Sequence, residues 1–223
     1  MQGPRLSCPI CNLRKEKRFC PAEHGRICAQ CCGEQREVTL DCPSDCPYLQ
    51  QARRHERPRD PSELDREALM PSVEIGEQFI YEHEHLILGL SFALAKSVHA
   101  NRTLTDRDLI AALTSHAKSY ETLVNSSLIY GERTANLSHQ AIASEVETMV
   151  KEYREAEQKH MGHTRLRDSD VLKALVFLLR MGVSRTSGRP KSRAFSDFLL
   201  AQFPEKESAI ASPDDAASRI IVP

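Results

Sequence analysis

Cysteines are the residues of this chain with the clearest chemical potential. All eight lie between Cys8 and Cys46, and the 177 residues that follow contain none. They are Cys8, Cys11, Cys20, Cys28, Cys31, Cys32, Cys42 and Cys46. The chain begins without the apolar run of an export signal, so we expect a cytoplasmic protein. Because thiols crowded together in a reducing compartment are more often metal ligands than disulfides, the sequence predicts metal binding by about the first fifty residues.

Two C-x2-C pairs indicate how the ligands are divided. A tight turn at each pair aims both sulfurs at one point, and Gly33 just after the second pair is expected to supply a positive φ. Four thiolates at about 2.3 Å match the tetrahedral preference of Zn²⁺ and close a structural site. Eight cysteines therefore predict two structural Zn²⁺ ions in a cross-brace. We expect the first ion on Cys8, Cys11, Cys28 and Cys31, and the second on Cys20, Cys32, Cys42 and Cys46.

Other ligand sets and other cysteine chemistry remain open at this point. His24 follows Cys20 by four residues and is the alternate ligand, but its use would leave one of Cys31 and Cys32 without a metal. Four-cysteine ligation is also found in iron–sulfur clusters. Redox-active or disulfide-bonded cysteines are the remaining interpretation. Spacing alone does not decide the connectivity.

The last ligands are expected at the start of a helix. Pro47 follows Cys46 directly and suits the first turn of a helix, where its missing N–H is not needed. Together with Phe19-Cys20-Pro21 and Ile27-Cys28-x2-Cys31-Cys32-Gly33, the run Cys42-Pro-Ser-Asp-Cys46-Pro-Tyr-Leu49 resembles the N-terminal finger of an uncharacterised group of bacterial proteins, of treble-clef or B-box-like form. The resemblance implies zinc and a cytoplasmic bacterial setting, and it carries no established activity.

Beyond the cysteines the pattern is helical. The fold class we expect is mainly α, with the small two-zinc finger followed by a bundle of about five helices. The predicted helices span 72–99, 105–130, 133–161, 168–181 and 194–203, with Ser72 as an N-cap and a sequence close to a capping box at Thr105–Asp108. The predicted organisation is a zinc-binding finger over 1–57, a proline-punctuated linker over 58–71, a helical domain over 72–203 and a loose tail over 204–223.

Two basic runs are candidates for binding an anion or a nucleic acid. The first lies between Cys11 and Cys20, and the second precedes the last predicted helix within residues 180–193. The candidate contacts are Arg14, Lys15, Lys17, Arg18, Arg185, Arg189, Lys191 and Arg193. The chain as a whole has a net charge of -1, which excludes a globally basic nucleic-acid coat. Solvated loops are the simpler interpretation of both runs.

Two Glu-x2-His pairs, Glu82 with His85 and Glu157 with His160, are spaced to share a helix face, as in the di-iron bundles. A helical di-metal oxidase is therefore a third hypothesis, but the pairs are explained more simply by chance. No nucleophile motif or dinucleotide fingerprint is present. Zinc closed by four thiolates also lacks the open position that hydrolysis requires.

The sequence predicts a zinc-binding, non-enzymatic interaction or regulatory protein. Its finger would present a rigid surface to an unidentified protein partner. A nucleic-acid-binding protein, transcription- or RNA-related, is the alternative. No stretch approaches about 18 uninterrupted apolar residues, so no membrane span is expected.

Overall fold

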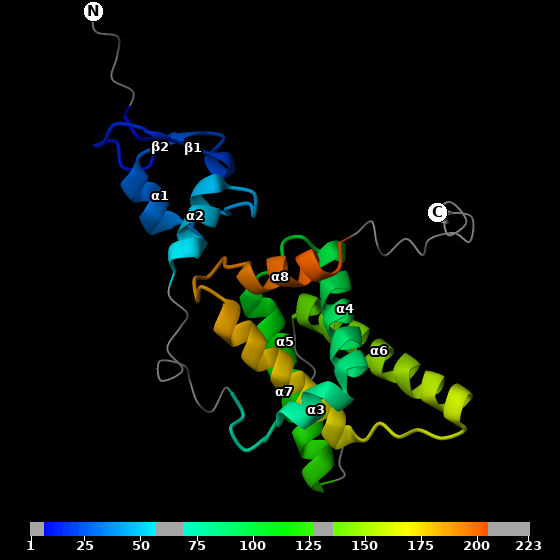
Figure 1. Cartoon of the computed structure of the whole chain (residues 1–223). Helices are drawn as coiled ribbons and strands as arrows, with labels where there is room; N and C mark the ends of the chain where they lie inside the picture. Colours follow the sequence, from blue (N-terminus) through cyan, green and yellow to red (C-terminus); the bar gives the residue numbers. More distant parts are fainter. Residues whose placement is uncertain (1–6, 57–68, 127–135, 205–223) are drawn as a thin grey trace, which may run out of the picture.

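The computed structural model describes residues 7–56, 69–126 and 136–204. An N-terminal part, which we call the finger, lies at one end of the molecule, and a larger helical part lies below it (Figure 1). The finger contains β1 (Arg18–Cys20), the short 3-10 helix η1 (Pro21–Glu23), β2 (Gly25–Ile27), α1 (Ala29–Gln35) and α2 (Pro47–His55). β1 and β2 pair antiparallel, with Arg18 opposite Ile27 and Cys20 opposite Gly25.

The rest of the described chain is helical, which confirms the mainly α prediction. Its helices are α3 (Glu77–Glu82), α4 (Glu84–Ala100), α5 (Asp106–Ser126), α6 (Leu137–Met161), α7 (Asp168–Arg185) and α8 (Ala194–Gln202). α5 packs against α6 and α7, while α4 packs against α6, α7 and α8. None of the described helices is both long and apolar enough to cross a membrane.

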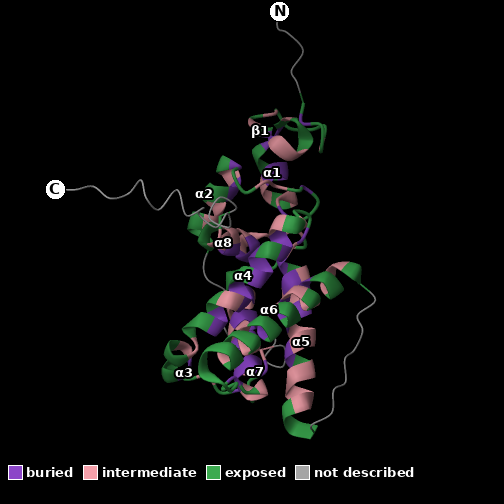
Figure 2. Ribbon diagram, turned by 90° about the vertical axis from the view of Figure 1, so that its right-hand side faces the viewer, coloured by how far each residue is buried: buried purple, intermediate pink, exposed green. Residues whose placement is uncertain are grey.

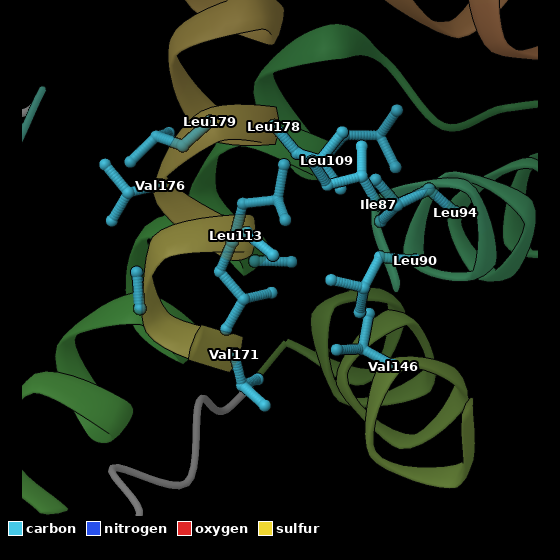
Figure 3. Close-up of a cluster of buried hydrophobic side chains, with 14 of the residues drawn as sticks. Ile87, Leu90, Leu94, Leu109, Leu113, Val146, Val171, Val176, Leu178 and Leu179 are labelled. Carbon is cyan, nitrogen blue, oxygen red and sulfur yellow. The ribbon is translucent and has the colours of Figure 1, made fainter. Parts of the chain in front are cut away.

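A single apolar core holds the helical part together. Leu90 of α4, Leu113 of α5 and Val146 of α6 point into the same interior, where Leu178 of α7 meets them (Figure 3). Buried residues gather along the inside of these helices, whereas most of the finger is exposed or half-buried (Figure 2). Apolar residues at helical spacing therefore position this part of the molecule, as their periodicity predicts.

The start of the helical part differs from the prediction. The first helix does not begin at Ser72: α3 begins at Glu77 with Gly76 as its N-cap. At His83 the backbone leaves helical geometry, with φ -115° and ψ 24°, and α4 begins at the next residue. The imidazole Nδ1 of His83 lies 3.1 Å from the Phe79 carbonyl oxygen, and the two rings stack. Local contacts at His83 thus divide the single predicted helix into two.

α7 is longer than its predicted end at Met181 and runs to Arg185. Gly182 lies inside the helix, and a Cβ atom there would come within 3.0 Å of the Phe195 ring. The glycine lets α7 approach α8 closely instead of ending the helix. As a result Arg185 is a helical residue, and its guanidinium lies over the ring of Phe198 at 3.6 Å.

Asp106, at the first position of α5, organises the start of α8. The carboxylate is fully buried. Its Oδ1 accepts from the backbone N–H groups of Phe195 and Ser196, and its Oδ2 accepts from the Ser192 hydroxyl. At the predicted start of this helix the Asp108 carboxylate accepts from the Thr105 N–H at 2.9 Å and from the Thr105 hydroxyl at 2.7 Å. One short segment therefore begins α5 and anchors α8.

Some predicted boundaries lie outside the described residues. The predicted linker over 58–71 falls mostly within 57–68, and the predicted tail over 204–223 falls almost entirely within 205–223. The predicted end of the second helix and start of the third fall within 127–135.

Candidate metal centre

Four cysteines of the finger form a cluster suited to one metal ion. The Sγ atoms of the cluster lie within 4.8 Å of one another, and those of Cys11 and Cys28 are 4.0 Å apart. A tetrahedral ion with Zn–S bonds of about 2.3 Å separates its sulfurs by about 3.8 Å. A disulfide, with its bond of about 2.05 Å, does not fit these separations, and the thiols are free. This first cluster consists of Cys8, Cys11, Cys28 and Cys31, the set that the spacing predicts for one ion.

The first C-x2-C pair is held in a closed turn. The Cys8 N–H donates to the Arg14 carbonyl at 2.8 Å, and the Asn12 N–H donates to the Cys8 carbonyl at 2.7 Å. The left-handed residue that completes the turn is Asn12, with φ 53°. Asparagine tolerates this conformation better than most residues with a side chain. The turn directs the sulfurs of Cys8 and Cys11 to the same side.

The second pair is positioned by a helix start. Cys28 is the N-cap of α1, and its Sγ accepts from the Cys31 N–H at 3.3 Å. The expectation that Gly33 supplies a positive φ is wrong, because Gly33 lies within α1 and its φ is not in the left-handed region. The helical N–H groups, not a glycine turn, place the two sulfurs, and the helix dipole favours thiolate charge there.

The electrostatics of the first cluster are uneven. The backbone N–H groups of Leu13 and Arg14 lower the pKa of Cys11 to about 6. Burial, followed by the neighbouring Cys28 thiol, raises the pKa of Cys31 to about 12. Near neutral pH the metal-free cluster therefore holds both thiolate and thiol. Binding of a divalent cation to all four sulfurs would displace the remaining protons.

The other four cysteines line one small pocket of the finger. We call Cys20, Cys32, Cys42 and Cys46 the second cluster. Cys20 ends β1, Cys32 lies in α1 and Cys46 is the N-cap of α2, as the position of Pro47 predicts. Among the described residues, the group whose ligand atoms all lie within 4.8 Å of one another is the first cluster, not this one. Among the described residues, the first cluster is thus the one whose sulfurs lie close enough together to hold an ion.

The second cluster contains a thiol with a raised pKa and a neighbouring cation. Burial raises the pKa of Cys42, and the charges of Cys46 and Cys20 raise it further, against a lowering hydrogen bond from the Glu37 backbone. The Arg18 guanidinium lies 3.6 Å from Cys32 Sγ and 4.7 Å from the centre of the Tyr48 ring. A cation therefore already lies beside these sulfurs.

The alternate ligand His24 lies on the turn between β1 and β2. Its side chain is exposed, and its backbone is left-handed with φ 49°. It belongs neither to the first cluster nor to the residues that line the pocket of the second. The structure therefore places all eight cysteines, and not this histidine, at the two clusters.

The two Glu-x2-His pairs are not brought together as ligands. Glu82 and His85 are both exposed. The Glu157 carboxylate instead accepts from the backbone N–H groups of Arg165 and Leu166 at 2.9 and 3.0 Å, while His160 is exposed. Within the described ranges, metal-binding geometry is found in the first cysteine cluster.

The first basic run lies beside the cysteines. Desolvation lowers the pKa of Arg14, but hydrogen bonds to the sulfurs of Cys28 and Cys11 outweigh it and raise the pKa overall, which places this guanidinium at the first cluster. Arg18 lies at the second cluster, as described above. Lys15 and Lys17 are exposed. Two of the four candidate cations thus face thiols.

The second basic run contacts the finger, which the sequence patterns do not predict. Arg189 donates to the carbonyls of Gly33 and Arg36 at 3.0 and 2.7 Å, at the end of α1 where the helix dipole is negative. The Lys191 ammonium donates to the Thr39 carbonyl at 2.6 Å. Arg193 forms an ion pair of 2.6 Å with Asp41. Partners some 150 residues apart leave no local signal in a sequence.

A metal held by four thiolates has no open coordination position. The first cluster can therefore organise the chain around an ion, but it provides no position where a substrate or water would bind the metal. Comparisons of this chain with protein-family models, with curated proteins and with solved structures find no match.

Proposed function

We propose that this chain is a zinc-binding, non-enzymatic interaction or regulatory protein whose finger is shaped by two structural Zn²⁺ ions. The observation that carries the proposal is the geometry of the first cluster, in which four thiols lie at separations suited to one tetrahedral ion. The convergence of the four remaining cysteines on one pocket supports the second ion. Closer approach of those four sulfurs would complete its ligand set.

The proposal is tested by metal content. We expect the full chain, purified without added metal, to carry two zinc ions in native mass spectrometry and elemental analysis. Cys11→Ser removes one ligand of the first cluster and Cys42→Ser one of the second, so each variant should lose one ion. Iron with sulfide, or a metal-free chain whose thiols are paired, would contradict the proposal.

Exposed apolar side chains on the finger support a role in binding a protein. Leu13 is 83% exposed, Phe19 is 55% exposed, and Ile10, three residues before Leu13, is 36% exposed. Apolar side chains of this size on a small, rigid module are typical of interaction surfaces. The finger would thus present Leu13 and Phe19 to a partner, while the ions hold the backbone beneath them.

A partner captured through this surface should be lost in Leu13→Glu, with zinc content unchanged. Val124→Glu is the matched control, because Val124 is exposed at the end of α5, away from the finger. A partner that is still captured by Leu13→Glu but is lost in Val124→Glu would mean that the binding surface lies elsewhere. Binding should also depend little on salt.

The alternative, nucleic-acid binding, uses the same two basic runs. It is weakened by the contacts of Arg189, Lys191 and Arg193 with the finger, which take up positive charge that a phosphate backbone would need. A steep fall in affinity for nucleic acid with added salt would favour this alternative over the protein-binding proposal.

A further inference from the structure

The finger residues that bind the helical part occupy one stretch of the chain. We call residues 33–53 the docking segment and residues 186–193, between α7 and α8, the basic loop. The hydrogen bonds and ion pairs that join the two parts use Gly33, Arg36, Glu37, Thr39, Asp41, Ser44 and Arg53 from the docking segment. On the helical side most of these bonds go to the basic loop, and those of Ser44 and Arg53 go to Asp197 of α8.

Glu37 lies at the centre of this contact. Its side chain is only 1% exposed. Oε2 accepts from the Ser187 hydroxyl at 2.9 Å, Oε1 accepts from Arg53 at 2.9 Å, and the backbone carbonyl accepts from the Lys191 N–H at 2.8 Å. A buried carboxylate is tolerated only when such partners surround it. Glu37 therefore requires the docked arrangement, which supplies Ser187 and Lys191.

The backbone at Glu37 is constrained as well. Its φ of 52° is left-handed, a conformation that glutamate rarely adopts. The Gln35 carbonyl accepts from the N–H groups of Val38, Thr39 and Leu40, which closes a tight turn around it. A conformation of this kind persists only where the surrounding structure enforces it.

The second cluster encloses this turn. Cys32 directly precedes Gly33, and Cys42 directly follows Asp41, so the two cysteines close the loop that carries Glu37. Cys46 is the N-cap of α2, the helix from which Arg53 reaches Asp197 at 2.6 Å. The ligands of the first cluster all precede the docking segment: Cys8 and Cys11 lie before β1, and Cys28 and Cys31 lie at the start of α1.

We propose that an ion in the second cluster couples the finger to the helical part, whereas an ion in the first cluster shapes only the finger. The ligand is a thiophilic divalent cation of the Zn²⁺ type. Its thiolate bonds close the Cys32–Cys42 loop in the form that binds the basic loop. Loss of this ion releases the docking segment and exposes Arg189, Lys191 and Arg193. This inference rests on the proposed function, because it requires an ion in the second cluster.

Hydrogen exchange of the full chain tests the coupling directly. The pair Cys42→Ser and Cys11→Ser is matched, since both thiols are half-buried and each belongs to one cluster. We expect Cys42→Ser to speed exchange in the basic loop, including the Lys191 amide, by roughly tenfold or more, because local opening governs protection. Cys11→Ser should leave exchange in the basic loop within about twofold of the wild type. Equal effects of both variants, or no effect of either, would overturn the inference.

Reciprocity supplies a second test that leaves every cysteine in place. If docking and ion binding are coupled, loosening the contact must lower the affinity for the ion by the same factor, typically about 5- to 150-fold. Glu37→Gln weakens the ion pair with Arg53, so competition with a chelator should remove one of two zinc ions more readily than in the wild type. Glu34→Gln is the control, because Glu34 is exposed on α1 and accepts only from Gln30 among its described contacts. Unchanged release of both ions from Glu37→Gln would overturn the inference.

These outcomes separate the inference from the function on which it rests. A wild type without zinc contradicts both. A wild type that binds two zinc ions, but whose basic loop exchanges equally fast with and without the ion in the second cluster, contradicts the coupling alone. A chain that binds a single ion in the first cluster also contradicts the coupling, while zinc binding itself stands.

Discussion

The finger and the helical part are stabilised by different means. The described buried core of the finger contains seven residues. Five of them are cysteines, and the other two are Ile27 and Leu40. The described core of the helical part contains 27 buried residues, and none of them is a cysteine. A segment of about fifty residues buries little apolar surface and is only marginally stable by that means. Removing metal ligands should therefore damage the finger, whereas creating a cavity in the apolar core should damage the helical part.

Removing a ligand from both clusters at once should have the largest effect. Structural zinc contributes about 10–16 kcal/mol to folding of small fingers, so the double variant Cys28→Ser with Cys42→Ser is expected to release both ions and unfold the finger. Helix content should fall by little more than the seven residues of α1 and the nine of α2, because the helical part keeps its core. Circular dichroism measures this change. Loss of most of the helical signal would mean that the two parts fold as one unit.

A cavity in the helical core should produce the opposite pattern. Leu178 of α7 is fully buried among the residues shown in Figure 3. Leu178→Ala is expected to lower the free energy of unfolding of the helical part by about 2–5 kcal/mol. Zinc stoichiometry should remain that of the wild type. Denaturant titration followed by circular dichroism, with metal analysis of the same sample, checks both expectations. Metal loss in this variant would contradict the conclusion that the finger and the helical part are stabilised separately.

The smallest expected effect is a pH dependence at the start of α7. Burial raises the pKa of Asp170, but hydrogen bonds and the charge of Arg167 outweigh it and hold the pKa below its usual value. A lowered pKa contributes stability that is present above the unfolded value and lost as pH falls through the folded value. The contribution should be under about 1 kcal/mol, since the Arg167 side chain is 77% exposed.

Urea titrations of the helical part between about pH 5 and pH 3 would measure this loss. In Asp170→Asn this part of the pH dependence should disappear. A wild type and a variant that lose stability in parallel over this range would contradict the assignment to Asp170. Zinc release in acid is followed separately on the same samples, because the finger has its own pH dependence.

Much of the fold could be predicted because the relevant patterns are local. The two C-x2-C pairs identified the four thiols that the structure gathers into the first cluster, since each tight turn or helix start aims two sulfurs together. Pro47 identified the start of α2, and the Thr105–Asp108 sequence identified the start of α5. The local patterns were misleading at Gly33 and at Gly182, where glycine lies within a helix instead of ending or turning it.

What only the tertiary structure decided is the environment of the second basic run. The residue types of Arg189, Lys191 and Arg193 indicate an affinity for negative charge, and the sequence determined that much. Which negative groups they bind depends on the packing of α7 and α8, which brings the loop between them to the end of α1. Hydrogen bonds act over about 3 Å in space, whatever the distance along the chain. The local sequence therefore shows which residues are charged, and the tertiary structure determines which groups they contact.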